Sequence, residues 1–559
     1  MCRCRGRRPP AGLYIRVIRE IRGEFLWTRA GDYNPRMTKS SVSRREFVAT
    51  GTALLAATYL PDWTEVFQPA ALNDAARAEA AEAALTAATK LGASYADIRI
   101  NRYRRESIAT RELQVQNVQR SASYGLGLRV LVNGAWGFAA TNRVEPAAAR
   151  AAAEQAVAIA RANAILATRK VVLADADNVV ASWNNPIKRD PFDVPLDTKV
   201  QFLMKLNESA MAVRGVSFVN SQILFVDEQK YFASTEGSRI TQRLARTYPQ
   251  FSVTAANRDT GDFQNRPVVD RAKLLGYEYV EDYPWLADAE QAGREAVEKL
   301  KARPVAPGRY DIVVDPSQLF LAIHESVGHS TELDRALGWE ANMAGTSFIK
   351  PADAGKLRFG AAIVNLVGDR TQPGGLATTG FDDEGVRAER WHLVRDGMFV
   401  DWQTTRELAP LVGQERSHGC LHADNWSSVP FPRMPNVSLE PASSDVTLDD
   451  LFSGIKRGLF IVGRGSSSID QQRYNFQFGG AVIREITNGK LGAVVRDAVY
   501  QSRTPDFWAG CDGIGGKTSY RLWGTSADGK GEPGQTNAVS HGCPPARFRQ
   551  VTVLNTASS

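Results

Sequence analysis

The sequence predicts an α+β fold, in which an N-terminal domain of mixed helices and hairpins precedes a β-rich C-terminal domain. Helical and strand-like stretches alternate irregularly in the first half, without the strict strand–helix order of a doubly wound sheet. A junction punctuated by proline and glycine, KARPVAPGRYDIVVDPS (301–317), leads into short strands, glycine turns and irregular loops. We therefore expect two domains, spanning 75–305 and 306–559.

The N-terminal domain shows its elements in order along the chain. Leucine and alanine recur at helical spacing over 72–93, which predicts a first helix. The alternating stretch YADIRINRYRRESIATRE follows, and Asn133-Gly134 between two β-runs is typical of a tight hairpin. A second helix is expected over 145–164, with Pro146 in its first turn. The same patterns predict helices over 195–215 and 287–302 and strands near 217–226 and 230–255.

The first 74 residues have the pattern of an export signal behind an extension. Residues 1–36 show no convincing periodicity and stop at Met37, so we expect them to be a spurious upstream extension. Behind Met37, the segment SRREFV with Arg44 and Arg45 resembles a twin-arginine signal, and the apolar run that follows is too short to span a bilayer. We expect 37–74 to be this signal and a linker. The mature protein would then be periplasmic or otherwise exported, without an integral membrane segment, or cytoplasmic if the signal is not used.

The distribution of charge excludes one class of partner. The formal net charge is +7, but residues 1–36 alone hold nine arginines against three acidic residues. The remainder of the chain is close to neutral and offers no electrostatic footprint for nucleic acid.

Only three cysteines follow the signal segment: Cys420, Cys511 and Cys543. This small, odd number argues against a disulfide framework.

The strongest chemical motif is HESVGH, residues 324–329. Its two histidines flank a glutamate as in a zinc helix, but they are five positions apart instead of four. In a regular helix this spacing leaves the rings about 140° apart, so they could not share an ion. A π-type turn, or unwinding at Gly328, would bring both rings to one face. His324 and His329 are then candidate metal ligands, and Glu325 is a candidate general base.

Several segments besides HESVGH resemble the TldD/PmbA family of metalloproteases, once called modulators of DNA gyrase. They include SYGLGLRVLVNGAWGFAATN in the first half, and TTGFDDEGVRAERWHLVRDGMF, PFPRMPNVSLEP and GKGEPGQTNAVSHGCPPARFRQVTV in the second. The matches run in the family's order from about residue 75 to the end. Because it has the H-E-x-x-x-H motif, the chain resembles the metal-bearing TldD members of the family.

The resemblance implies a zinc peptidase that cleaves unfolded or extended peptides in an enclosed cavity. It also implies a homodimer, or a heterodimer with a PmbA-like subunit. By the same resemblance His324 and His329 match the zinc ligands and Glu325 matches the base. The alternative is a catalytically silent TldD/PmbA-like binding partner that has lost tight metal binding.

The third ligand departs from the family's pattern. Where the family has a cysteine before GK…GQ, this chain has Asp528. Asp528 could ligate directly, since zinc accepts two histidines and a carboxylate. Alternatively Cys543, fifteen residues further on, could supply a thiolate, and the softer ligand slightly favours Cys543. His541 and Cys511 are lesser candidates.

Two loops in the second half carry further candidate residues. Asp382, Asp383 and Glu384 precede a glycine, and they form either a turn with solvated charges or a functional loop that supports the metal histidines or lines a cavity wall. His418 and His422 flank Cys420 in SHGCLHADNW, a spacing that is not diagnostic of a second metal. The resemblance implies substrate contact instead, because the corresponding family segment resembles a loop that faces the cleft.

Overall fold

The computed structural model describes residues 74–558 of the chain. Residues from Pro69 onward group into one compact unit. The expected upstream extension (1–36) and almost all of the expected signal segment (37–74) lie outside the described residues. None of the described helices has both the length and the hydropathy needed to cross a bilayer.

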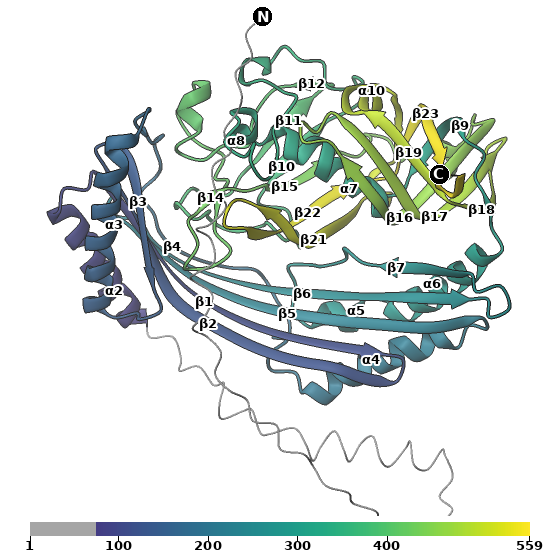
Figure 1. Cartoon of the computed structure of the whole chain (residues 1–559), viewed down its shortest axis with the longest axis horizontal. Coiled ribbons are helices and arrows are strands. Elements are labelled where there is room, and N and C mark those ends of the chain that lie inside the picture. Colours follow the sequence, from purple (N-terminus) through teal and green to yellow (C-terminus); the bar gives the residue numbers. More distant parts are fainter. Residues whose placement is uncertain (1–73, 559) are drawn as a thin grey trace, which may run out of the picture. The chain divides into compact units, whose positions relative to one another are not determined.

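A long antiparallel sheet forms the N-terminal half of this unit (Figure 1). Its central strands β1 (Tyr95–Arg111), β2 (Gln114–Val132), β5 (Val216–Ser234) and β6 (Arg239–Ala256) are 17 to 19 residues long. The strand order is β3-β2-β1-β5-β6-β4, with β7 (Phe263–Val268) also paired to β6. The edge strands are β3 (Ala135–Thr141) and β4 (Val180–Asn184), and β4 runs parallel to β6.

The predicted hairpin is confirmed in detail. Val132 pairs with Ala135, and Asn133 and Gly134 between them both have positive φ, as a type I′ turn requires. One expected boundary is wrong: the chain turns between β5 and β6 at residues 235–238, where Gly237 has positive φ, and not near residue 228. Residues 227–230 are the polar run DEQK, which has the composition of a turn, but it lies within β5, where Asp227, Glu228 and Lys230 are buried.

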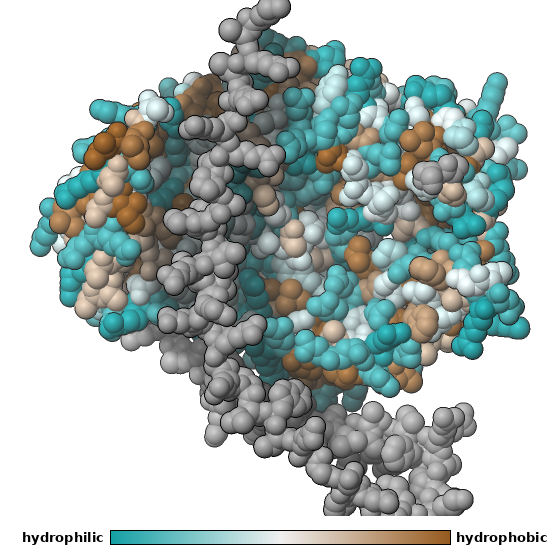
Figure 2. Space-filling view, viewed as in Figure 1, coloured by the Kyte–Doolittle hydropathy of each residue, from teal (hydrophilic) through white to brown (hydrophobic). Residues whose placement is uncertain are grey.

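Helices cover the sheet at its two ends and form separate cores. Helices α2 (Asp74–Lys90) and α3 (Pro146–Leu166) pack on β1, β2 and β3 through alanine-rich faces. Helices α4 (Leu196–Met211), α5 (Glu278–Asp282) and α6 (Trp285–Leu300) pack toward the other end. Figure 2 shows a mostly hydrophilic surface with apolar areas gathered where Figure 1 places α3, whose end exposes Ile165 and Leu166.

The C-terminal half is β-rich, as expected, and its main sheet closes into a ring. Strands β16, β9, β23, β19 and β17 pair in that order, and β16 pairs with β17 again. Strands β18, β8 and β20 extend it. The bounds are β8 (Arg303–Pro304), β9 (Gly308–Val314), β16 (Arg457–Ile469), β17 (Asn475–Thr487), β18 (Lys490–Arg496), β19 (Ala498–Arg503), β20 (Cys511–Ile514) and β23 (Ala546–Asn555).

Smaller sheets and short helices surround helix α7 (Pro316–Ile323), whose eight residues are all buried. One sheet has the order β12-β11-β10-β15, and two further pairs are β13 with β14 and β21 with β22. Their bounds are β10 (Leu366–Asp369), β11 (Arg390–Arg395), β12 (Met398–Phe399), β13 (Leu421–His422), β14 (Phe431–Pro432), β15 (Asn436–Leu439), β21 (Arg521–Lys530) and β22 (Gln535–Cys543). The remaining helices are α8 (Leu333–Ala336), α9 (Leu448–Phe452) and α10 (Thr504–Ala509), with 3₁₀ turns at His329–Thr331, Pro351–Asp353, Ala409–Val412, Lys517–Ser519 and Thr556–Ser558.

Candidate metal centre

Helix α7 carries the H-E-x-x-x-H motif at its C-terminal end. The helix begins where Asp315 accepts a hydrogen bond from the Ser317 backbone N–H, with Pro316 in the first turn. It continues as a π-helical turn over His324–Gly328, in which the His329 backbone N–H donates to the His324 carbonyl. The rings of His324 and His329 lie 4.6 Å apart between centroids. The π-type turn expected from the five-residue spacing is therefore confirmed.

Gly328 has a different role from the one expected. Its φ and ψ of −53° and −58° are ordinary helical values, so the turn does not need glycine's conformational freedom. A Cβ at this position would instead lie 2.4 Å from the Met434 sulfur. A larger residue here would require the buried Met434 side chain, which packs directly against the turn, to move.

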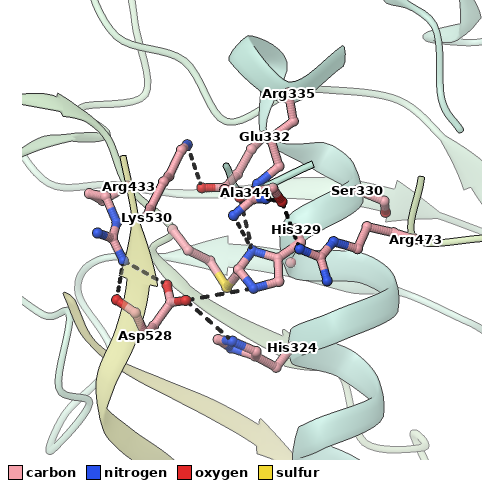
Figure 3. Close-up of polar contacts among 12 residues, drawn as sticks. His324, His329, Ser330, Glu332, Arg335, Ala344, Arg433, Arg473, Asp528 and Lys530 are labelled. Atoms are coloured by element: carbon pink, nitrogen blue, oxygen red, sulfur yellow. Dashed lines mark hydrogen bonds and ion pairs between the residues drawn. The ribbon is translucent and has the colours of Figure 1, made fainter. Parts of the chain in front are cut away.

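Asp528 on strand β21 faces the two histidines (Figure 3). Its Oδ1 lies 3.6 Å from His324 Nε2 and 3.6 Å from His329 Nε2, and the three ligand atoms fall within 4.8 Å of one another. All three side chains are buried. Bond lengths of about 2.0–2.1 Å at a tetrahedral zinc place neighbouring ligand atoms roughly 3.3 Å apart. The donor set and its spacing therefore fit zinc.

The thiol of Cys543 does not join this group. Cys543 lies at the end of β22, opposite Arg521, and its Sγ contacts the carbonyl oxygen of Pro316 at the start of α7. Burial and the nearby Asp315 hold the pKa of the thiol well above its usual value, so the thiolate is disfavoured. The preference for Cys543 over Asp528 has no support in this geometry. Cys511 is also buried away from the group, with its Sγ near the Gly513 carbonyl.

His541, a lesser candidate for a ligand, instead contacts His324 from behind. Its Nδ1 lies 2.8 Å from the Val437 carbonyl oxygen, so Nδ1 carries the proton and donates. Its Nε2 therefore accepts from His324 Nδ1, also at 2.8 Å. This chain of hydrogen bonds fixes the tautomer of His324 with the lone pair on Nε2, the atom that faces Asp528.

Glu332 and Arg335 hold the second histidine. His329 Nδ1 lies 3.0 Å from one carboxylate oxygen of Glu332 and 3.1 Å from Arg335 Nη2. Arg335 also contacts the same oxygen of Glu332, and Lys530 contacts the other. Lys530 comes from β21, two residues beyond Asp528, so the same strand supplies a candidate ligand and part of its support. Burial and the Arg335 charge lower the pKa of His329 to about 4, which leaves a neutral ring at neutral pH.

The carboxylates of Asp528 and Glu325 both have cationic partners. Arg433 lies 3.0 Å from the second oxygen of Asp528 and also contacts its backbone carbonyl. Arg473 lies 3.1 Å from Glu325. Burial raises the pKa of Glu325, but the two histidines and Arg473 outweigh it, so the pKa is lowered and the group is ionised at neutral pH.

Sequence reasoning missed these supporting residues. Glu332 had a signal, because it follows His329 at helical i+3 spacing, in the segment TELD (331–334) directly behind the motif. Arg433, Arg473 and Lys530 had none, since each lies about a hundred residues or more from the histidines in sequence.

The acidic loop lies away from the two histidines and is not solvated. Asp382, Asp383 and Glu384 are all buried, which contradicts the reading as a turn with exposed charges. Asp383 pairs with Lys230 on β5 at 2.8 Å, and Glu384 lies 3.6 Å from Arg129 on β2. The loop therefore connects the C-terminal half to the N-terminal sheet, and Asp382 and Asp383 line a small cavity there.

The two histidines of the second loop have separate environments. His418 stacks on Trp391 at 4.4 Å and lies between Glu389 and Asp401. His422 lies 3.5 Å from Asp383 and lines the same cavity as the acidic loop. Burial and the charge of Lys230 lower the pKa of His422 to about 3, so its ring is neutral.

Comparison with known proteins identifies the family. The PmbA/TldA metallopeptidase domain 1 matches residues 96–160, the central domain matches 189–303, and the C-terminal domain matches 307–555. Together these cover more than half of the chain. The chain belongs to the TldD/PmbA family of metalloproteases, and its α+β fold with a β-rich C-terminal region is that of the family.

Individual relatives agree with this assignment. A metalloprotease of Methanothermobacter thermautotrophicus is 29% identical over 462 residues, covering 83% of this chain and 96% of the relative. A zinc metalloprotease TldD homolog of Saccharolobus solfataricus is 23% identical over 485 residues, covering 83% and 98%.

Solved structures show the same fold. The putative modulator of DNA gyrase from Thermotoga maritima has a TM-score of 0.68 at 15% identity, covering 85% of this chain and all of that one. TldE from Thermococcus kodakarensis has a TM-score of 0.64 at 16% identity, covering 85% and 99%.

Proposed function

We propose that the protein is a zinc-dependent peptidase of TldD type that cleaves unfolded or extended peptides in an enclosed cavity. The observation that carries this proposal is the convergence of His324, His329 and Asp528, which the π-helical turn makes possible. The names of the relatives, metalloprotease and zinc metalloprotease, support the same reaction class.

The residues present could perform the steps of peptide hydrolysis. Zinc held by His324, His329 and Asp528 would polarise the scissile carbonyl and acidify water. Glu325 is ionised and lies on the same turn, so it can take a proton from the attacking water and return it to the leaving amine. Arg473 keeps the Glu325 carboxylate in place through its hydrogen bond.

The silent-partner alternative finds less support. A chain that had lost tight metal binding would not need two buried histidines whose rings are held in place by His541 and Glu332. We also propose that the protein works as a homodimer or with a PmbA-like subunit, and that it is exported by the twin-arginine route. The fold likeness to TldE and the segment around Arg44 and Arg45 support these two proposals.

Zinc content and peptide hydrolysis test the proposed function together. We expect His324→Ala and His329→Ala to lose zinc and activity, and Glu325→Gln to keep a full equivalent of zinc while losing turnover. Asp528→Asn should bind zinc poorly, and Cys543→Ser should bind it like the wild type. Less than about a tenth of an equivalent of zinc in folded wild-type protein would favour the silent partner. Full zinc in Asp528→Asn would remove that residue from the site.

A further inference from the structure

A small cavity lies between the N-terminal sheet and the C-terminal half, outside the group of His324, His329 and Asp528. Its walls come from β5 and β6, the acidic loop, β13 and β22. The space open to the centre of a water molecule is about 20 Å³, enough for one or two water-sized particles. Three cationic side chains, Lys230, Arg246 and Arg370, line it together with Asp382 and Asp383.

Two of the three cations already have anionic partners. Lys230 lies 2.8 Å from Asp383 and 3.2 Å from Glu228. Arg246 lies 2.7 Å from the other oxygen of Glu228. These pairs compensate both cations with Glu228 and with Asp383, which itself lines the cavity.

Asp382 is close enough for the charge of Arg370 to lower its pKa, but it forms no ion pair with Arg370 at 4.0 Å or less, and backbone groups contact both of its oxygens. One oxygen accepts from the N–H groups of Glu384 and Val386, at 3.0 and 2.9 Å. The other accepts from the Leu421 N–H at 3.1 Å. Asp382 therefore acts as the hydrogen-bonded centre of its own loop.

Arg370 has the Cys420 thiol as a side-chain neighbour but no ion-pair partner within 4.0 Å among the described residues. Its side chain is only 4% exposed, and its Nε and Nη1 donate no hydrogen bond. Within residues 74–558, no carboxylate forms an ion pair with it at 4.0 Å or less. Buried charges in proteins are ordinarily paired and hydrogen-bonded. The neutral ring of His422 cannot compensate the guanidinium charge.

We propose that Arg370 and this cavity bind one singly charged anion, either a free halide ion or the C-terminal carboxylate of a peptide. The space suits a single ion. A second cavity of about 130 Å³ shares Arg246, His422 and Ala538 with the first, so an extended peptide lying there could place its last carboxylate against Arg370. Only this carboxylate form rests on the proposed peptidase function.

Halide binding is tested by thermal unfolding of the full chain at constant ionic strength, with methanesulfonate replaced stepwise by bromide. The wild-type midpoint should rise with bromide, and the midpoint of Arg370→Met should not. The exposed Arg358, which donates only to the Asp396 carbonyl, provides the control: Arg358→Met should keep the wild-type response. If Arg370→Met does not fold, anomalous scattering from wild-type crystals soaked in bromide decides, because the ion should lie beside Arg370.

Carboxylate binding is tested without turnover, by calorimetry on the Glu325→Gln protein. Acetylated pentapeptides with a free or an amidated C-terminus should differ in affinity by roughly 10-fold or more, the effect of one charge-assisted hydrogen bond. Adding Arg370→Met should abolish the difference. If only the unfolding midpoint responds to bromide, the bound anion is a halide. If the protein binds the free C-terminus more tightly than the amide, the bound anion is the peptide carboxylate. Absence of both responses, or their persistence in Arg370→Met, overturns the proposal whether or not the protein proves to be a peptidase.

Discussion

Replacing Gly328 by alanine tests the packing that holds the two histidines on one face. The backbone at Gly328 is helical, so alanine itself is allowed and recovers about 0.5–1 kcal/mol of backbone entropy. Its Cβ, however, would lie 2.4 and 2.7 Å from the Sδ and Cε of Met434, where about 3.5–4.0 Å is the normal contact distance. Met434 must therefore move by more than 1 Å, roughly the difference between those distances.

The surroundings give Met434 little room to move. Its side chain is fully buried, and its carbonyl is fixed by a hydrogen bond from Asn537. Overpacking of this kind costs about 1–3 kcal/mol, so we expect Gly328→Ala to be destabilised by about 1–2 kcal/mol after the entropy gain. Because Gly328 directly precedes His329, zinc affinity should fall as well.

A double-mutant cycle separates this packing effect from a general intolerance of alanine. Met434→Ala alone should destabilise the protein by about 2–5 kcal/mol through the cavity it leaves. In that background Gly328→Ala should become neutral or stabilising, because the clash is gone. The measurements are denaturation midpoints and zinc affinity by chelator competition. If Gly328→Ala behaves the same in both backgrounds, Met434 is not the reason for the glycine.

Three further predictions concern other parts of the chain. Glu332→Gln should weaken zinc binding about 10–100-fold in chelator competition, whereas Asp334→Asn, which also contacts Lys530, should not; equal affinities would contradict a supporting role for Glu332. Burial lowers the pKa of His418, but the neighbouring carboxylates of Asp401 and Glu389 raise it more, to about 9. The charged ring therefore stabilises the fold fully below pH about 6.5, and this stabilisation is lost as the pH rises through 9. The difference in free energy of unfolding between wild type and His418→Gln should be about 3 kcal/mol larger at pH 6 than at pH 10. A difference that does not depend on pH, measured by denaturation, would contradict this. Replacing Arg44 and Arg45 by lysine should retain the protein in the cytoplasm on cell fractionation, and normal export would contradict the twin-arginine interpretation.

Local geometry was predictable where chemistry and spacing combine within a few residues. Two histidines five positions apart on a regular helix cannot share an ion, so the motif predicts a π-type turn or local unwinding, and the π-type turn is present. The hairpin at Asn133-Gly134 is likewise fixed by the need for two positive φ angles. In contrast, the burial of Asp382 to Glu384 could not be predicted, because their partners Lys230 and Arg129 lie more than 150 residues away in the sequence.

The third metal ligand could not be chosen from the sequence without the register of the β21–β22 hairpin. Asp528 and Cys543 are close in sequence, and ligand softness alone favours the cysteine. The register of β21 and β22 reverses that preference: Asp528 lies opposite Asn537, whereas Cys543 lies opposite Arg521. Six residues separate Asn537 from Cys543, or roughly 20 Å along a strand. The thiol accordingly reaches Pro316, at the far end of α7 from His324, about 12 Å away along the helix. A hairpin predicted in register would have excluded Cys543 from the metal centre, because the two residues lie on paired strands at positions about 20 Å apart along the hairpin.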